Sequence, residues 1–232
     1  MSIRCAARLL GAAGLAAGAV LSSVQAQQAS AATCPDVEVV FARGSTEAPG
    51  VGVVGQGFVD ALRGQLGPRS VDVYPVNYPA SGDFASSGFS SQVMTGVRDA
   101  GSHVKATSAT CPTTKVVLGG YSQGAIVAAF VAAAQPAAGL PASTVADHVA
   151  AVTLFGKPSG AFVGKYDAPD LALGPQYVTQ TIDLCIPGDT VCDGNPGGGT
   201  NAAHRLYSSN GMTTQAAQFA AEQIPPAGPP AA

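Results

Sequence analysis

The chain has 232 residues, a formal net charge of −3, and 11% charged against 47% hydrophobic residues. This length is enough for one sizeable hydrophobic core. Basic residues do not outnumber acidic ones, which argues against a nucleic-acid partner. So few charges favour apolar surface, as in a protein that works on lipid. The alternative is that small residues, mainly alanine and glycine, inflate the apolar count.

The first thirty-one residues have the pattern of a secretory signal peptide. Arg4 and Arg8 precede a short, glycine-interrupted apolar stretch, and the small residues Ala29-Ser30-Ala31 follow it. We expect cleavage after Ala31, which removes both arginines and lowers the formal net charge to −5. The segment 1–31 therefore predicts a secreted, extracellular protein, either free or associated with the cell wall.

The remaining chain is predicted to be one domain, residues 32–225, followed by a flexible Pro/Ala tail, residues 226–232. No later segment has about eighteen unbroken apolar residues, the length that a membrane-spanning helix needs. We therefore expect no stable membrane anchor.

Short β-branched runs alternate with longer helical stretches along this domain. The predicted strands are 37–44, 70–79, 114–120, 148–156 and 176–185. The predicted helices are 55–66, 90–109, 123–134 and 213–224. This alternation predicts right-handed βαβ crossovers and an α/β fold, with a mostly parallel, five-stranded central sheet and helices on both faces. Functional residues of such a fold gather beyond the carboxyl ends of the strands.

Four cysteines remain after Cys5 is lost with the signal, and an even number in an exported chain implies two disulfides among three connectivities. Cys185 and Cys192 close a short loop, so we pair them, and Cys34 then pairs with Cys111. No Cys-x-x-Cys or histidine pair is present, so no metal site is expected.

The stretch Gly120-Tyr121-Ser122-Gln123-Gly124 fits the pattern G-x-S-x-G between a predicted strand and a predicted helix. A nucleophilic serine in this place turns sharply with strained backbone angles, and side chains at the two glycine positions would collide with their neighbours. We predict that Ser122 is a nucleophile. The alternative is a packed corner that happens to contain serine.

A serine nucleophile needs a general base, and the chain has three histidines. His103 lies inside a predicted helix, and His148 opens a strand at the end of the sheet opposite the expected site. His204 follows the last strand in a glycine-rich stretch that can reach back to the site. Position therefore favours His204 as the base and a structural role for His148.

The base needs an orienting carboxylate, which follows the serine and precedes the histidine in this chain order. The aspartates in that interval are Asp147, Asp167, Asp170, Asp183, Asp189 and Asp193. Asp189 lies just past a strand end, in a loop that its own disulfide makes rigid, and rigidity favours catalysis. Asp193 is the rival, and an ordinary surface loop is the alternative for the whole segment.

Taken together, "CPDVEVVFARGSTE", "GYSQG", "CIPGDTVC" and "AAHRLY" resemble the cutinase family of secreted serine esterases, in its bacterial branch, over nearly all the mature chain. The resemblance implies Ser122 as nucleophile, His204 as base and Asp189 as orienter. It also implies the Cys34–Cys111 pair. Ser45 and Gln123 correspond to the residues that form the oxyanion hole in the family.

The resemblance further implies a three-layer α/β-hydrolase without a lid that hydrolyses short- to medium-chain fatty acyl esters without a cofactor. We expect the protein to be a monomer. The segment 159–177 is expected to border the acyl cleft. The alternatives are a lipase or phospholipase, an acyltransferase with the same triad, and a non-catalytic secreted binding protein or antigen.

Overall fold

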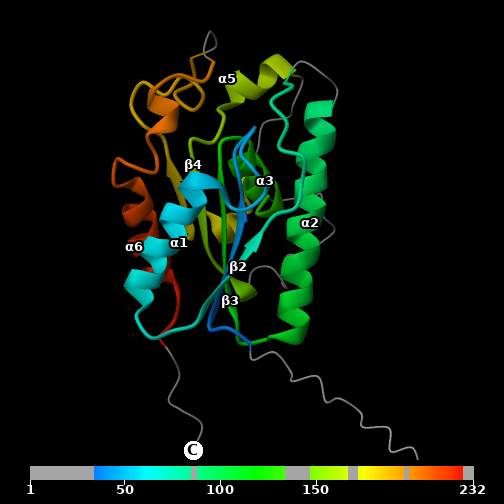
Figure 1. Ribbon diagram of the computed structural model, residues 1–232. Coiled ribbons are helices and arrows are strands. Elements are labelled where there is room, and N and C mark those ends of the chain that lie inside the picture. Colours follow the sequence, from blue (N-terminus) through cyan, green and yellow to red (C-terminus); the bar gives the residue numbers. More distant parts are fainter. Residues whose placement is uncertain (1–33, 85–87, 134–146, 167–171, 196–198, 227–232) are drawn as a thin grey trace, which may run out of the picture. The chain divides into compact units, whose positions relative to one another are not determined.

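The computed structural model describes residues 34–84, 88–133, 147–166, 172–195 and 199–226 (Figure 1). The expected signal segment 1–31 and nearly all of the expected tail 226–232 lie outside the described residues.

A five-stranded sheet forms the centre of the domain, with all neighbouring strands parallel. Its spatial order is β2-β1-β3-β4-β5, which confirms the predicted parallel α/β architecture. The strands are β1 (Val37–Ala42), β2 (Val71–Pro75), β3 (Lys115–Tyr121), β4 (Val149–Phe155) and β5 (Thr181–Leu184). Because the strands are parallel, their carboxyl ends meet at one edge of the sheet.

Four strands are shorter than predicted, and the largest differences are in β2 and β5. The stretch 176–185 was expected to be one strand, but Pro175–Tyr177 forms a 3-10 turn, η2, and only Thr181–Leu184 pairs with β4. Proline at the first position favours a helical turn, and the Thr181 hydroxyl donates to the Tyr177 carbonyl at 2.7 Å. The edge strand β2 ends at Pro75, which has no N–H to continue the ladder.

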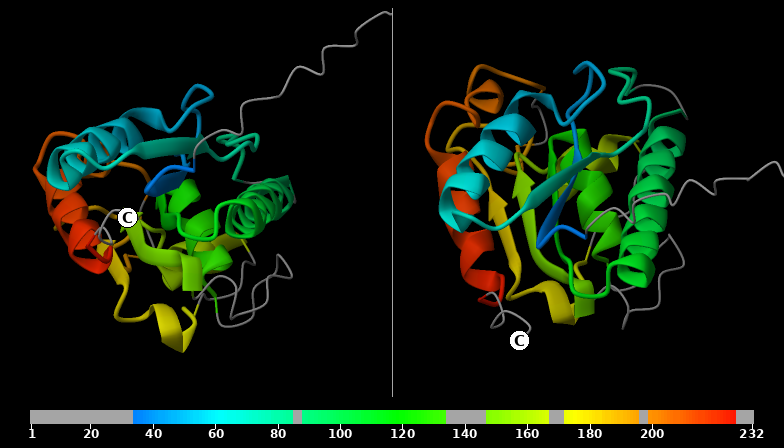
Figure 2. Two further views of the ribbon diagram at one scale, coloured as in Figure 1. Left: turned by 90° about the horizontal axis from the view of Figure 1, so that it is seen from below. Right: turned by 60° about the horizontal axis from the view of Figure 1, so that its bottom comes forward.

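Helices cover both faces of the sheet, as predicted, and the two views of Figure 2 show the sheet between them. One face carries α1 (Gly52–Leu66) and α6 (Met212–Gln223), which pack against each other. The other face carries α2 (Gly88–Thr110) and α3 (Gln123–Val131) (Figure 1). The short elements are α5 (Gly160–Val163), η1 (Gly164–Tyr166), η2 and η3 (Ala203–Arg205).

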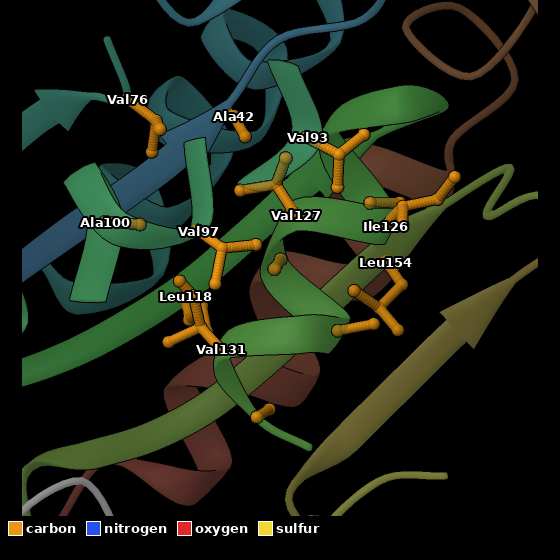
Figure 3. Close-up of a cluster of buried hydrophobic side chains, with 14 of the residues drawn as sticks. Ala42, Val76, Val93, Val97, Ala100, Leu118, Ile126, Val127, Val131 and Leu154 are labelled. Atoms are coloured by element: carbon orange, nitrogen blue, oxygen red, sulfur yellow. The ribbon is translucent and has the colours of Figure 1, made fainter. Parts of the chain in front are cut away.

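The core has two halves because successive side chains of a strand point to opposite faces of the sheet. Along β1, Val39 and Phe41 pack under α1 and α6, whereas Val40 and Ala42 pack under α2 and α3. Figure 3 shows the second half, in which valines of α2 and α3 meet β3 around Leu118. The central strands β3 and β4 are buried on both faces, which explains their continuous apolar runs.

Two disulfides anchor the ends of elements. Cys34–Cys111 joins the residue before Pro35 to the end of α2, and its S–S distance is 2.05 Å. Cys185–Cys192 closes the loop that follows β5. These are the two pairs expected from the sequence. Among the helices in the described ranges, none is long and apolar enough to cross a membrane.

Candidate active site

Ser122 stands on a strained turn at the carboxyl edge of the sheet. It lies between the last residue of β3 and the first residue of α3, with φ 54° and ψ −119°. A positive φ is unfavourable for serine and persists only where the surroundings impose it. The Ser122 N–H donates to the Phe155 carbonyl of β4 at 2.9 Å, which fixes the turn against the neighbouring strand.

The two glycines of G-x-S-x-G leave room for this turn. A Cβ atom on Gly120 would lie 2.1 Å from the Gly124 carbonyl oxygen. A Cβ on Gly124 would lie 2.0 Å from the Ala42 carbonyl oxygen. Both distances are far below van der Waals contact and both obstacles are backbone atoms, so only glycine allows α3 to approach β1 and β3 this closely.

We expect Gly124→Ala to lower the free energy of unfolding by about 3 kcal/mol or more, because the helix must move away from β1. Chemical denaturation measures this. Gly64→Ala is the matched control, since Gly64 is in α1 with nothing within 4 Å of an added Cβ. It should stabilise the protein by about 0.5–1 kcal/mol. Equal effects of the two substitutions would contradict the packing argument.

The structure brings Ser122, His204 and Asp189 into one hydrogen-bonded line. His204 Nε2 lies 2.9 Å from Ser122 Oγ, and His204 Nδ1 lies 2.8 Å from Asp189 Oδ2. The residues are 7%, 2% and 0% exposed, respectively, so protein shields the line from water. The carboxylate accepts hydrogen bonds only, which places a proton on Nδ1 and leaves the Nε2 lone pair for the serine hydroxyl.

Asp189 is held as a buried carboxylate. Its Oδ2 accepts from the Tyr207 hydroxyl at 2.6 Å as well as from His204, and its Oδ1 accepts from the Val191 N–H at 3.0 Å. Burial by itself would raise the pKa of Asp189, but these hydrogen bonds outweigh it and hold the pKa below its ordinary value. The group is therefore charged at neutral pH and can stabilise a positive imidazolium.

Two further side chains hold the His204 backbone, and the sequence did not single them out for this. Asn201 accepts from the His204 N–H at 3.1 Å and donates to the Gly188 carbonyl at 2.7 Å, so it ties the histidine segment to the Asp189 loop. The Tyr121 hydroxyl donates to the His204 carbonyl at 2.5 Å. Tyr121 is within the G-x-S-x-G motif, but the motif assigns no role to that position.

Ser45 and Gln123 lie side by side next to Ser122. The Ser45 hydroxyl donates to Gln123 Oε1 at 3.0 Å. Within the described residues, neither backbone N–H donates to another protein group. The neighbouring Thr46 has φ 64° and donates its N–H to the carbonyl of Ala80, at φ 50°, over 2.7 Å. Two such unfavourable conformations beside the site indicate a tightly determined loop.

A buried arginine and a glutamate shape this loop. Arg43 donates from Nε to the Glu47 carbonyl at 2.9 Å and from Nη2 to the Tyr78 carbonyl at 2.8 Å. The Glu47 carboxylate accepts from the N–H groups of Gly44 at 2.6 Å and Val53 at 2.9 Å. Both residues belong to the run "ARGSTE", from which the sequence assigned a role only to the serine.

A hollow of about 240 Å³ opens over Ser122 and His204. Its other lining residues are Ser45, Thr46, Gly82, Phe84, Tyr121, Thr200 and Arg205. A larger hollow of about 620 Å³ lies beside the first turns of α1, and none of its lining residues belongs to the hydrogen-bonded line. None of the described residues of 159–177 lines the smaller hollow, and Phe162 and Val163 of α5 are buried in the core. Residues 167–171 of this segment lie outside the described residues.

The rival histidines lie elsewhere. His103 Nε2 is 2.8 Å from Glu38 Oε1, on the α2 side of the sheet. His148 immediately precedes β4, at the end of the sheet opposite Ser122.

Three of the rival aspartates are described, and they lie apart from the hydrogen-bonded line. Asp183 pairs with Lys157 at 3.3 Å, and Asp193 is exposed and accepts from the Asn195 N–H at 2.9 Å. Asp147 is exposed, and its carbonyl accepts from Lys115 at 3.0 Å. Asp167 and Asp170 lie outside the described residues. In the part of the chain that the structure describes, no group of three His, Cys, Asp or Glu side chains could hold a metal ion.

Comparison with known proteins identifies the family. The cutinase family model matches residues 33–224. Carboxylesterase Culp1 of Mycobacterium tuberculosis is 48% identical over 199 residues, which covers 84% of each chain. Phospholipase Culp4 of the same organism is 46% identical over 222 residues, which covers 93% of this chain and 90% of that one.

Solved structures agree with these matches. A Trichoderma reesei cutinase in complex with a phosphonate inhibitor superposes with a TM-score of 0.64 at 31% identity, over 83% of this chain and 78% of that one. An acetyl xylan esterase superposes with a TM-score of 0.67 at 26% identity, over 83% of this chain and all of the other. The chain therefore belongs to the cutinase family of carboxylic ester hydrolases.

Proposed function

We propose that the chain is a secreted serine esterase whose catalytic triad is Ser122, His204 and Asp189. The observation that carries the proposal is the buried line of hydrogen bonds from the strained serine through the imidazole to the carboxylate, with distances of 2.9 and 2.8 Å. This arrangement supplies a nucleophile, a base and an orienter within hydrogen-bond reach of one another.

In the first half of the reaction, Ser122 Oγ attacks the ester carbonyl carbon and its proton passes to His204 Nε2. Asp189 keeps the other proton on Nδ1 and stabilises the imidazolium. The tetrahedral intermediate then collapses, the bond to the alcohol oxygen breaks, and His204 returns the proton to the leaving alcohol. The product is an acyl group bound to Ser122.

Water completes the cycle by the reverse sequence. His204 takes a proton from water, the resulting hydroxide attacks the acyl carbon, and the bond to Ser122 Oγ breaks. The proton returns to Oγ, and the free carboxylic acid leaves. No step needs a metal or an organic cofactor.

The developing oxyanion would be held by the backbone N–H groups of Ser45 and Gln123. The Gln123 N–H opens α3, where the helix dipole favours negative charge. The hydrogen bond between the two side chains keeps the two N–H groups at a constant spacing before substrate arrives. A preorganised pair of donors stabilises the transition state more than the neutral ester.

Ser45→Ala should lower kcat about 10²-fold and leave KM nearly unchanged, because it removes both the hydroxyl and the bond that positions the two residues. Steady-state kinetics on p-nitrophenyl butyrate measures this. Ser91→Ala, at an exposed position of α2, is the control and should behave as wild type. A rise in KM alone would mean that Ser45 binds the ground state rather than the oxyanion.

The substrate is proposed to be a short- or medium-chain fatty acyl ester. The hollow of about 240 Å³ is small for a ligand site, since drug-sized pockets have volumes of about 300–1,000 Å³. Phe84 supplies an apolar wall beside the catalytic serine. A lipase or phospholipase is the second candidate, favoured by the relative named phospholipase at 46% identity.

The experiment uses p-nitrophenyl esters of graded acyl length together with a fluorophosphonate probe. The proposed esterase turns over short and medium chains, and peptide mapping finds the probe on Ser122. A rate that falls steeply as the acyl chain shortens would favour the lipase or phospholipase. Acyl ester formed from an added alcohol would favour an acyltransferase. Folded protein with neither turnover nor labelling would leave a non-catalytic binding protein.

The location is proposed to be extracellular, with removal of residues 1–31, no stable membrane anchor and a monomeric protein. The two disulfides fit an oxidising compartment. The test is N-terminal sequencing and light scattering of protein collected from culture medium. A start at Ala32 and a monomer mass support the proposal, whereas full-length chain retained in the cells contradicts it.

A further inference from the structure

Tyr207 lies three residues after His204 and is fully buried, yet its hydroxyl belongs to the polar line of the site. The hydroxyl donates to Asp189 Oδ2 at 2.6 Å and accepts from the Ile186 N–H at 3.1 Å. Its ring meets the His204 ring edge-on, with centroids 6.1 Å apart. The triad needs no phenol for proton transfer, so this placement calls for another role.

The oxygen that accepts from Tyr207 is the one that accepts from His204. Both bonds end on Asp189 Oδ2, at 2.6 and 2.8 Å, while the Val191 N–H binds Oδ1. We propose that Tyr207 is a positioning residue for the ester hydrolysis, which acts by holding Asp189 Oδ2 toward His204 and by sharing its negative charge. This inference rests on the proposed function of Ser122, His204 and Asp189.

The positioning effect follows from the hydrogen bonds on each carboxylate oxygen. With Tyr207 and Val191 on different oxygens, rotation of the carboxyl group about its bond to Cβ would break both bonds. Without the phenol, the Val191 N–H is the one backbone donor in the described structure that still holds the Asp189 carboxylate. The buried Ile186 N–H also loses its acceptor. Misplacement of a catalytic group by about 1 Å can cost about 10²-fold in rate.

The charge effect has a definite sign. In a buried site, each donor to a carboxylate takes up part of its negative charge. Removing the phenol leaves more charge facing the imidazole and favours its protonated form. The other titratable side chains around the pair are Tyr121, whose ring lies 5.1 Å from that of His204, and Arg205 in the hollow. Neither is changed in the variants below.

The test compares Tyr207→Phe with Tyr74→Phe. Tyr74 is a matched control, because its hydroxyl donates to the Asp99 carboxylate at 3.1 Å, away from the site. Active sites are first counted with diethyl p-nitrophenyl phosphate, and kcat, KM and the pH profile on p-nitrophenyl butyrate are then measured per counted site. For Tyr207→Phe we expect kcat to fall about 10–10²-fold. KM should stay unchanged, and the acid limb of kcat/KM should move to higher pH.

A purely structural role would lower the number of counted sites without moving the pH profile, and that result overturns the inference. Equal kinetics of Tyr207→Phe and wild type overturn it as well. If Tyr207→Phe does not fold, a variant with 3-fluorotyrosine in place of Tyr207, and of no other tyrosine, tests the inference. It keeps the ring and makes the hydroxyl a stronger donor, so the acid limb should move to lower pH, and an unmoved limb refutes the inference.

The outcome for the proposed function is separate. If wild type is neither labelled by the phosphate ester nor active on p-nitrophenyl butyrate, the proposed function fails, and this inference fails with it. If wild type is labelled and active but the acid limb of kcat/KM is the same in the position-207 variants, only the role of Tyr207 is refuted.

Discussion

Replacing Ser122 by alanine should lower kcat on p-nitrophenyl butyrate by a factor on the order of 10⁵ or more, because it removes the atom that forms the acyl-enzyme. The hydroxyl oxygen lies 2.9 Å from His204 Nε2 and has no neighbouring serine hydroxyl on the same turn to replace it. Slow residual hydrolysis by water would remain, since the oxyanion donors and the binding hollow are intact.

The same substitution should change stability little, because the introduced alanine would keep the backbone bond to Phe155 and would be strained at φ 54° as serine is. Thermal unfolding therefore separates loss of chemistry from loss of fold. Ser102→Ala, at an exposed position of α2, is the control and should retain full activity. A fully active Ser122→Ala would refute the triad, and fluorophosphonate labelling would then have to lie elsewhere.

Asp189→Asn should lower kcat by about 10⁴-fold while the protein remains folded. The asparagine NH₂ cannot accept from His204 Nδ1–H, so the histidine is favoured in the tautomer with its proton on Nε2, which cannot take the serine proton. In the wild-type protein, the Asp189 carboxylate accepts three hydrogen bonds, from His204, Tyr207 and Val191. An amide with one acceptor oxygen cannot satisfy them all.

Asp193→Asn is the matched control, because Asp193 is four residues away in the same segment and was the rival in the sequence. It is exposed and binds the nearby Asn195 N–H rather than the histidine. We expect its kcat to stay within about twofold of wild type, as for a surface substitution that leaves the site intact. If Asp193→Asn were the inactive variant and Asp189→Asn the active one, the assignment of the orienting carboxylate would be wrong.

The sequence alone determined the architecture of this protein and predicted the residues of its candidate site. The β-branched runs and the helices between them specify a parallel sheet, because a helix between two strands returns the chain to the same end of the sheet. Gly120 and Gly124 mark the turn at Ser122, since a Cβ atom at either position would overlap backbone. Cys185 and Cys192 flank Asp189 in the sequence, and this short disulfide loop singled out Asp189 among the candidate aspartates.

Several boundaries and supports needed the tertiary structure. Strand β5 starts at Thr181 rather than at residue 176, because Pro175 starts a 3-10 turn and the Tyr177 carbonyl at its end accepts from the Thr181 hydroxyl. Phe162 and Val163 of the segment 159–177 pack into the core, and none of the segment's described residues lines the hollow over Ser122. Periodicity detects apolar positions, but it does not say which neighbouring surface will cover them.

The supports of the site were decided only by the fold. The side chains of Asn201, Tyr121 and Tyr207 donate hydrogen bonds to residues in other segments of the chain. Their acceptors are the carbonyls of Gly188 and His204 and the carboxylate of Asp189, respectively. Spacing within a motif reports local backbone geometry, so it can find the turn at Ser122. The partner of a buried hydroxyl or amide depends on where distant backbone segments end after packing, and that information exists only in the assembled tertiary structure.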